Sequence, residues 1–273
     1  MIYKVKYFDV LCIKSKSSNV EIVQSLLNKY CLGSYLVNGI TNLYFEAGIK
    51  NTIDKELIEI SNLFNFEYNW DKQNQENWHL AWQENFKPIN INGKLRIIPY
   101  WDSKTKEKNI IKIKPGMAFG TGHHETTWLV LNKMIEYIKS DISILDCGSG
   151  SGILSIAAKK LGAKKIDSVE FDIDCKDNFL ENIKINNINK DINYYHSDIL
   201  LWKNYNYDMI LVNINKNILM QLIPKLESAS GLIILSGLLE SDYNSIESLL
   251  INSDFKILDL TTKGEWICLV VKK

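Results

Sequence analysis

The run of residues 146–152, Asp-Cys-Gly-Ser-Gly-Ser-Gly, is the part of this chain whose residue types and spacing most directly predict binding chemistry. Its glycines allow a tight backbone turn and a close approach to a ligand. A helix that starts at such a turn presents its N–H groups to polar or anionic atoms. Glu170 follows a second apolar run, where a carboxylate could accept hydrogen bonds from both hydroxyls of a ribose. The pattern therefore predicts a nucleoside site.

The spacing of the glycines separates this pattern from a dinucleotide fingerprint. That fingerprint needs G-x-G-x-x-G, whereas here the third glycine arrives one residue earlier and Ile153 occupies the sixth position. Apolar residues at 142–145 and 166–169 flank a helical pattern at 153–161, so the expected order is strand, glycine turn, helix and strand. The site should hold a nucleoside without the pyrophosphate geometry of NAD.

The second half of the chain alternates between strand and helix patterns. Helices are expected between the first five strands and before the sixth, which predicts a doubly wound, mostly parallel α/β sheet. The last two strands are separated only by Lys263-Gly264 and should form an antiparallel hairpin. The expected strands lie near residues 142–146, 166–170, 192–196, 208–213, 231–236, 255–261 and 265–271.

Residues 1–70 are predicted to form a small ferredoxin-like α+β domain, because their patterns follow the order β-α-β-β-α-β. This unit has no glycine loop and no catalytic cluster, so we expect it to recognise the substrate. Its expected elements are a strand at 3–7, a helix from 18 that Gly33 stops, strands at 34–37 and 42–47, a helix at 53–64 and a strand at 66–70.

A linker is expected at residues 71–90, with a polar stretch at 71–77 and a short helix at 78–86. Residues 91–273 then form the second domain, which begins with two short strands at 95–99 and 110–113.

The composition excludes several classes of protein. Lys+Arg and Asp+Glu are both 32, and this zero net charge argues against broad phosphate neutralisation, so no direct nucleic-acid binding is expected. The five cysteines form no C-x-x-C pair and are odd in number, which favours a reducing, cytoplasmic location. No apolar run approaches the ~20 residues of a membrane span. The asparagine-rich run at 186–190 is interpreted as compositional bias.

Several segments resemble known methyltransferases. The D-x-G-x-G-x-G run followed by an acid resembles the first motif and acidic partner of AdoMet-dependent methyltransferases of the Rossmann-like class, which also end in an antiparallel hairpin. Residues 115–127, P-G-x-A-F-G-T-G-x-H-x-T-T, resemble the signature of the PrmA family, which methylates the eleventh protein of the large ribosomal subunit. Further matches lie at residues 77–88, 99–101, 146–158, 170–172, 212–214, 235–239 and 264–266.

The resemblance implies a role for five residues. Thr127 would contact AdoMet, and Gly148 and Gly150 would lie against it at the glycine turn. Glu170 would bind the ribose. Asn213, at the end of the fourth strand expected in the doubly wound sheet, would lie beside the methionine portion and the transferred methyl, and it is both the candidate catalytic residue and a cofactor contact.

The chain departs from the family pattern at two places. The family usually has Asp where this chain has Glu170, a change that keeps the chemistry. Asn215-Lys216-Asn217 stands where many relatives have small residues, so the resemblance does not define the shape of the substrate entrance in this chain.

Other polar residues have simpler interpretations. Adjacent histidines point to opposite sides, so His124 is expected to fix its loop by hydrogen bonding and no metal is expected. Glycines 116, 120 and 122 could form a lid over the cofactor or a plain turn. Asp198 could accept from the adenine amino group or cap a helix. Cys147 is expected to be a packing residue.

The sequence thus predicts a monomeric, AdoMet-dependent protein-lysine N-methyltransferase that acts on amino groups of a large-subunit ribosomal protein, with the N-terminal amine as a further acceptor. Two alternatives remain open at this point. The chain could methylate RNA or a small molecule on the same fold. The N-P-P-[YF] signature of amide and adenine-amine methyltransferases is absent, however, since residues 213–215 read N-I-N. It could also be a non-catalytic AdoMet-binding partner of the ribosome.

Overall fold

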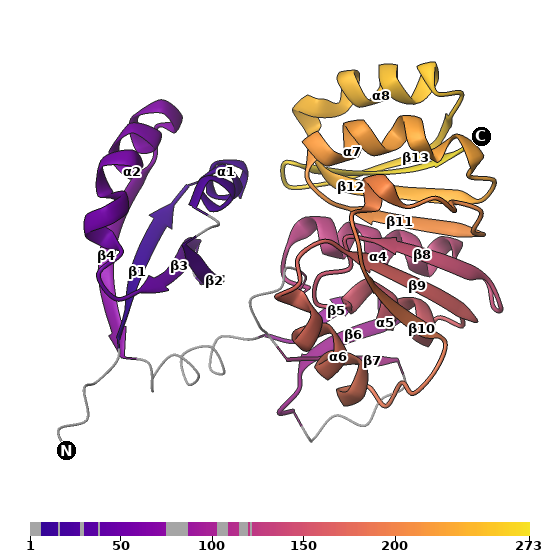
Figure 1. Ribbon diagram of the computed structural model, residues 1–273, viewed down its shortest axis with the longest axis horizontal. Coiled ribbons are helices and arrows are strands. Elements are labelled where there is room, and N and C mark those ends of the chain that lie inside the picture. The colour runs from indigo at the N-terminus through magenta and orange to yellow at the C-terminus, as the bar shows by residue number, and fades with distance from the viewer. Residues whose placement is uncertain are drawn as a thin grey trace. The chain divides into compact units, whose positions relative to one another are not determined.

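The protein consists of two compact units, Met1–Lys87 and Pro88–Lys273, in a computed structural model (Figure 1). None of its described helices combines the length and the apolarity that a membrane-spanning segment needs. The structure describes residues 7–15, 17–27, 30–37, 39–74, 87–102, 109–114, 120 and 122–273. The predicted strand positions Tyr3 and Val5, the predicted helix at 78–86 and Gly116 lie outside these residues.

The first unit is a four-stranded antiparallel sheet in the order β2-β3-β1-β4, accompanied by two helices. Apolar side chains of β1, β3 and both helices form its core, including Leu11, Val23, Phe45 and Leu57. The elements are β1 (Tyr7–Lys14), α1 (Ser17–Leu27), β2 (Cys31–Val37), β3 (Ile40–Glu46), α2 (Lys50–Phe64) and β4 (Glu67–Asn74).

Three predictions for this unit are wrong in their boundaries. The first strand was expected at residues 3–7, whereas β1 is described at Tyr7–Lys14 and shares only Tyr7 with that range. The polar stretch expected as a linker from residue 71 continues β4, in which Asp71 pairs with Val10 and Asn74 with Tyr7. A strand at the edge of a sheet tolerates polar side chains, which hid it from the hydrophobic pattern. The helix α1 ends at Leu27, and Gly33 lies inside β2 at an irregularity of the pairing.

The second unit is built on a seven-stranded sheet in the order β10-β9-β8-β11-β12-β14-β13. All neighbouring pairs are parallel except those of β14, which is antiparallel to both β12 and β13. This confirms the doubly wound sheet with a final hairpin. The strands are β8 (Ser143–Cys147), β9 (Lys165–Glu170), β10 (Ile192–His196), β11 (Met209–Asn213), β12 (Leu232–Leu239), β13 (Lys256–Lys263) and β14 (Trp266–Lys272).

The helices follow the predicted alternation with one exception. Between β10 and β11 the chain forms only the short 3-10 turn η1 (Ile199–Leu201) where a helix was expected. The buried Tyr205 and Tyr207 fill the space, and their hydroxyls donate to Ile199 O and Asp167 Oδ2 at 2.8 and 2.7 Å. The other helical segments are α4 (Glu125–Tyr137), α5 (Ile153–Lys160), α6 (Cys175–Ile185), α7 (Lys216–Leu222), η2 (Ile223–Ser228), η3 (Glu240–Asp242) and α8 (Tyr243–Asn252).

A three-stranded sheet precedes α4. It contains β5 (Ile89–Ile91), β6 (Leu95–Pro99) and β7 (Ile110–Ile113) in the order β5-β6-β7. The last two match the prediction, whereas β5 is too short to show a pattern.

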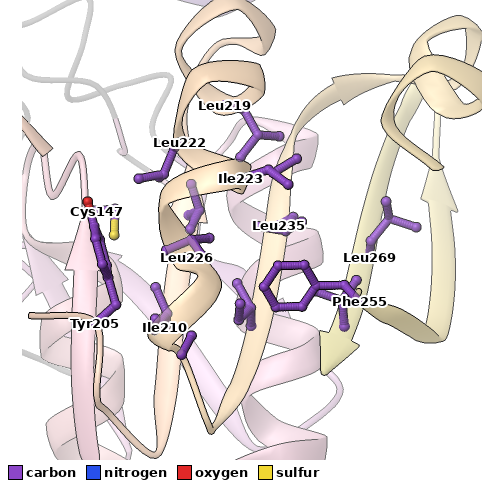
Figure 2. Packing of buried hydrophobic residues seen from close by; sticks show 14 of the residues in the cluster. Cys147, Tyr205, Ile210, Leu219, Leu222, Ile223, Leu226, Leu235, Phe255 and Leu269 are labelled. Atoms are coloured by element: carbon purple, nitrogen blue, oxygen red, sulfur yellow. The ribbon is translucent and has the colours of Figure 1, made fainter. Parts of the chain in front are cut away.

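The main core of the second unit lies between the sheet and α7, η2 and α8 (Figure 2). Ile210 and Leu235 of adjacent strands pack there with Leu219, Leu222 and Phe255. These side chains are fully buried or nearly so, and burying one of this size stabilises the fold by about 1.5–3 kcal/mol. The packing gives β8, β11 and β12 a rigid base, and their carboxyl ends carry the candidate site.

Candidate nucleoside and amine site

The carboxyl ends of four parallel strands meet along one edge of the seven-stranded sheet. Strands β8, β9 and β11 end at Cys147, Glu170 and Asn213, and Asn213 lies beside Ser236 of β12. The strand order reverses between β8 and β11, and ligands of open α/β sheets bind at such a switch point. The sequence-predicted residues Gly148, Gly150, Glu170 and Asn213 all lie at or directly after these strand ends.

The glycine turn after β8 needs glycine for its backbone conformation. Gly148, Gly150 and Gly152 have φ angles of 73°, 48° and 83°, in the left-handed region that L-residues with a side chain avoid. Gly152 caps α5, and a β-carbon there would lie 2.8 Å from the ring of Phe179. The turn therefore brings bare backbone to the switch point.

Glu170 is joined to the glycine turn. Its Oε2 accepts a hydrogen bond from Gly150 N at 2.8 Å, and its Oε1 accepts one from Asp172 N at 2.9 Å. These bonds fix the carboxylate while leaving lone pairs for further donors, since each oxygen has two. The arrangement can bind a vicinal pair of hydroxyls.

Asp146, the first residue of the glycine motif, is fully buried at the end of β8. Its Oδ2 accepts from Ser155 Oγ at 2.5 Å, whereas Oδ1 has no partner among the described residues. The pKa of this carboxyl is raised to about 7, because burial and the negative charge of Glu170 raise it by more than the Ser155 hydrogen bond lowers it. A donor or a cation beside Oδ1 would stabilise the ionised form.

Thr127 lies in the first turn of α4 and is fully buried. Its hydroxyl oxygen is without a hydrogen-bond partner in the part of the chain that the structure describes. A buried hydroxyl without a partner costs about 1–3 kcal/mol. Its position is consistent with a contact that a ligand completes.

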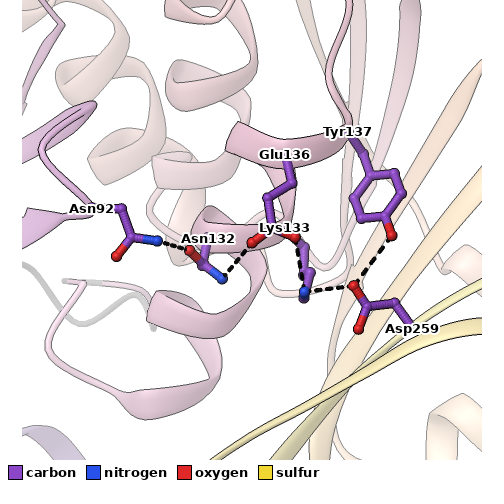
Figure 3. Close-up of polar contacts among 6 residues, drawn as sticks. All are labelled: Asn92, Asn132, Lys133, Glu136, Tyr137 and Asp259. Atoms are coloured by element: carbon purple, nitrogen blue, oxygen red, sulfur yellow. Dashed lines mark hydrogen bonds and ion pairs between the residues drawn. The ribbon is translucent and has the colours of Figure 1, made fainter.

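The second half of helix α4 is held in place by a chain of polar contacts (Figure 3). Lys133 Nζ donates to Asp259 of β13 at 2.7 Å and to Glu136 at 2.9 Å, and the Tyr137 hydroxyl donates to the same Asp259 oxygen. Burial lowers the pKa of the Lys133 ammonium, but the bonds to Asp259 and Glu136 outweigh it, so the pKa lies above its ordinary value. The network fixes α4, and with it Thr127, against the hairpin.

The start of α4 is capped by His124. Its Nδ1 accepts from Thr126 N at 3.3 Å, and its ring lies edge-on to Trp266 at 5.0 Å between centroids. This confirms that His124 fixes its loop. No cluster of His, Cys, Asp and Glu suited to a metal occurs within the described ranges.

Asn213 is the last residue of β11 and is half-buried. The helix cap that could have explained an asparagine here is provided instead by Asn215, whose Oδ1 accepts from Ile218 N at 3.1 Å. The Asn213 side chain is therefore not required to start α7. It remains a candidate for positioning a substrate.

Three other predicted residues have clear structural positions. Asp198 caps η1, its Oδ1 accepting from Leu200 N at 2.8 Å, which agrees with the cap interpretation. Cys147 is fully buried and burial raises its thiol pKa well above the ordinary value, as expected of a packing residue. The carbonyl of Gly120 accepts from Ser151 Oγ at 2.5 Å, which joins the loop before α4 to the glycine turn.

Sequence reasoning missed a row of asparagines on α6. Asn182 is fully buried and joins two segments, since it accepts from Lys114 N at 2.7 Å and donates to Ser151 O at 3.0 Å. Asn186 accepts from Lys112 N and donates to Lys112 O, so the interpretation of its run as compositional bias is wrong for this residue. The i, i+4 spacing from Asn178 was the available signal.

The sheet order, the glycine turn and the acid that it binds define an α/β protein with a methyltransferase-like fold. The crystal structure of a ribosomal protein L11 methylase from Lactobacillus delbrueckii subsp. bulgaricus is similar, with a TM-score of 0.64 and 33% identity over 69% of this chain and 99% of that one. A ribosomal protein L11 methyltransferase from Prochlorococcus marinus strain AS9601 is 37% identical over 83% of this chain and 78% of its own length. Another, from strain MIT 9515, is 30% identical over 99% of both chains.

The profile of the ribosomal protein L11 methyltransferases (PrmA) matches residues 13–273. The chain belongs to this family.

Proposed function

We propose that this chain transfers methyl groups from AdoMet to amino groups of a large-subunit ribosomal protein, at lysine side chains and at the N-terminal amine. The single observation that carries the proposal is the Glu170–glycine-turn site at the switch point of a PrmA-family chain. RNA and small-molecule substrates are less well supported, because the chain has no net charge and matches the family over nearly its whole length.

The residues at the strand ends fit AdoMet. Glu170 would accept from the ribose hydroxyls, and the glycines at 148 and 150 would admit the cofactor against bare backbone. Thr127 Oγ1 and Asp146 Oδ1 are buried polar atoms that lack partners among the described residues, and the ligand would complete them. When bound, AdoMet supplies an electrophilic methyl group on a positively charged sulfur.

The chain's own task is to present a neutral amine in line with the methyl carbon. An amine with a pKa near 10.4 is neutral only about once in a thousand molecules near pH 7.4, which corresponds to about 4 kcal/mol. Desolvation at the edge of the sheet lowers the pKa of the amine. Asn213 would align the amine, because its side-chain oxygen would accept a hydrogen bond from one of the amine N–H groups. In that position the nitrogen lone pair would face the methyl group that bound AdoMet supplies, and the methylated ammonium product would lose its proton to water.

The first unit is proposed as the recognition domain for the ribosomal protein. Its β-α-β-β-α-β order and the β2-β3-β1-β4 sheet support a ferredoxin-like assignment. Together with a linker ending near residue 90 and a methyltransferase domain at 91–273, it would act as a monomer in the cytoplasm, where ribosomal proteins are made. No direct contact with nucleic acid is proposed.

The test is methyl transfer to purified ribosomal proteins. The chain is incubated with AdoMet carrying a labelled methyl group and with the large-subunit proteins or, in a parallel reaction, with ribosomal RNA, and mass spectrometry locates the label. We expect label on lysine or N-terminal nitrogens of the eleventh large-subunit protein. Label confined to RNA would favour the first alternative, and AdoMet binding without transfer would favour a non-catalytic partner.

A further inference from the structure

Ile214 occupies the space between two glycines at the carboxyl edge of the sheet. A β-carbon placed on Gly148 would lie 2.5 Å from Cγ2 of Ile214, and one placed on Gly237 would collide with the Ile214 carbonyl oxygen. Gly148 follows β8 and Gly237 lies in β12, on the two sides of β11. The Ile214 side chain therefore occupies the room that a side chain at position 148 would need, and the Ile214 backbone occupies the room at position 237.

The surroundings of Ile214 are apolar. It directly follows Asn213, is half-buried and packs against the main core cluster, to which the fully buried Cys147 and Val212 also belong. The nearest polar side chain of β12, Ser236, is also fully buried and its hydroxyl donates to Ile267 O at 2.9 Å. Ile214 is thus the bulky apolar group of the switch point, beside the candidate catalytic asparagine.

We propose that the Ile214 side chain forms the apolar wall of the reaction centre and excludes water from the acceptor amine. This inference rests on the proposed function and assigns a role to a residue that does not hydrogen-bond to the substrate. Ile214 is a positioning residue in this sense. Its branched β-carbon limits its rotamers, so the wall keeps one shape.

The wall favours the neutral form of the amine. Removing water from an amine lowers its pKa, and a pKa that is lower by one raises the neutral fraction about tenfold at any pH well below it. The ionisable side chains at the ends of β8 and β9, at the start of α7 and in η3 after β12 are Asp146, Cys147, Glu170, Lys216, Glu240 and Asp242. Lys216 and Asp242 form an ion pair at 2.7 Å. These groups are present in every variant proposed below, so their titration is common to all.

The test compares two substitutions of nearly equal shape. Ile214→Val removes one methylene and keeps the wall apolar, whereas Ile214→Thr has the shape of valine with a hydroxyl that binds water. Single-turnover methyl transfer to the ribosomal protein is measured from pH 7 to 10. We expect Ile214→Val to keep the wild-type pH profile, and Ile214→Thr to be about tenfold slower near pH 7.5, with its rise displaced upward by about one pH unit and most of the rate recovered at pH 10.

The matched control is Ile218→Thr in α7. Ile218 is also half-buried against the same core cluster but lies one helical turn away. Its substitution should lower the melting temperature without moving the pH profile. If Ile214→Thr does not fold, Ile214→Ala opens the same wall to water and should give the same displacement.

Three outcomes would overturn the inference. The first is an unchanged pH profile in both Ile214→Thr and Ile214→Ala, and the second is an equal displacement in Ile218→Thr. The third is a wild-type chain that transfers no methyl group at any pH, which overturns the proposed function itself. The wild-type measurement therefore separates the failure of the function from the failure of the wall.

Discussion

Asp9 of the first unit and Asp146 of the second are both buried but have opposite surroundings. Asp9 on β1 is 4% exposed, and its Oδ2 accepts from the backbone N–H groups of Gly48 and Lys50 at 2.8 and 3.3 Å. Asp146 on β8 is fully buried and accepts from Ser155 alone, with Oδ1 unpartnered among the described residues. The first carboxylate stabilises a turn, whereas the second leaves a binding capacity that only a ligand or a proton can use.

The glycines of the two units also differ in the room around them. Gly39 and Gly48 of the first unit would meet nothing within 4 Å if they carried a β-carbon, whereas Gly148, Gly152 and Gly237 would collide with neighbouring atoms. The described part of the first unit also contains no buried side-chain polar atom without a partner. A close approach of backbone at Gly148 and, among the described residues, an unpartnered buried polar atom at Asp146 therefore occur together at the switch point of the second unit, and such costs are tolerated where a ligand completes a site.

The largest effect is expected from removing the first unit. A truncated chain that begins at Pro88 retains the whole second unit and should bind AdoMet within about threefold of the full chain, because the residues proposed to bind it are kept. Its methylation of the ribosomal protein should fall by about 100-fold or more, since remote binding energy positions the acceptor. Calorimetry and single-turnover transfer measure the two quantities. Full activity of the truncation would show that the first unit is dispensable.

The next largest effect is expected on substitution of Asn213 and not of Asn215. If Asn213 positions the amine, Asn213→Ala should lower kcat by about 100-fold, as for the removal of one oriented polar group, while AdoMet affinity falls less. Asn215→Ala is the matched control, because Asn215 caps α7 and its loss should cost about 1 kcal/mol of stability with little change in kcat. Near-native turnover of Asn213→Ala would mean that other groups orient the amine.

A smaller effect is expected at the ribose acceptor. Glu170→Ala should weaken AdoMet binding by about 1.5–3 kcal/mol, the range for hydrogen bonds to a charged group. Calorimetry is compared with Asp172→Ala, which removes an exposed carboxylate of the same charge two residues away. Equal losses in the two variants would indicate that general charge, and not the bond to the ribose, binds the cofactor.

Much of the fold was predictable because its signals are local. Six of the seven strands of the large sheet end within two residues of the prediction, and β12 departs most, ending at Leu239 instead of residue 236. The glycine turn and Glu170 were also found from sequence, since a buried strand before and a helix after leave few alternatives. The hydrogen bond between Gly150 and Glu170 adds the contact that spacing could only suggest.

What the sequence could not provide depends on tertiary partners. The edge strand β4 is polar in its last residues because only one of its sides is paired, by β1. Asn182 looks like any polar helix residue until Lys114 and Ser151 lie beside it. The position of Ile214 between two glycines likewise requires three strands that are far apart along the chain.

The smallest expected effect is a change in stability that has opposite signs at the two aspartates. Because the Asp146 pKa is about 7 in the folded chain against 3.8 ordinarily, the folded state keeps a proton that the unfolded state has released between these pH values. The free energy of unfolding therefore falls as the pH rises from about 4 to about 7 and stays lower above it. Asn at this position cannot ionise and still accepts from Ser155, so Asp146→Asn should raise the melting temperature of the ligand-free second unit by several °C at pH 8 and by little at pH 4.

Asp9→Asn replaces a charged acceptor of two backbone N–H groups by a weaker neutral one and should lower the melting temperature at pH 8. Calorimetric melts at the two pH values measure both, and a destabilised Asp146→Asn at pH 8 would show that the Asp146 carboxylate is already stabilised without a ligand.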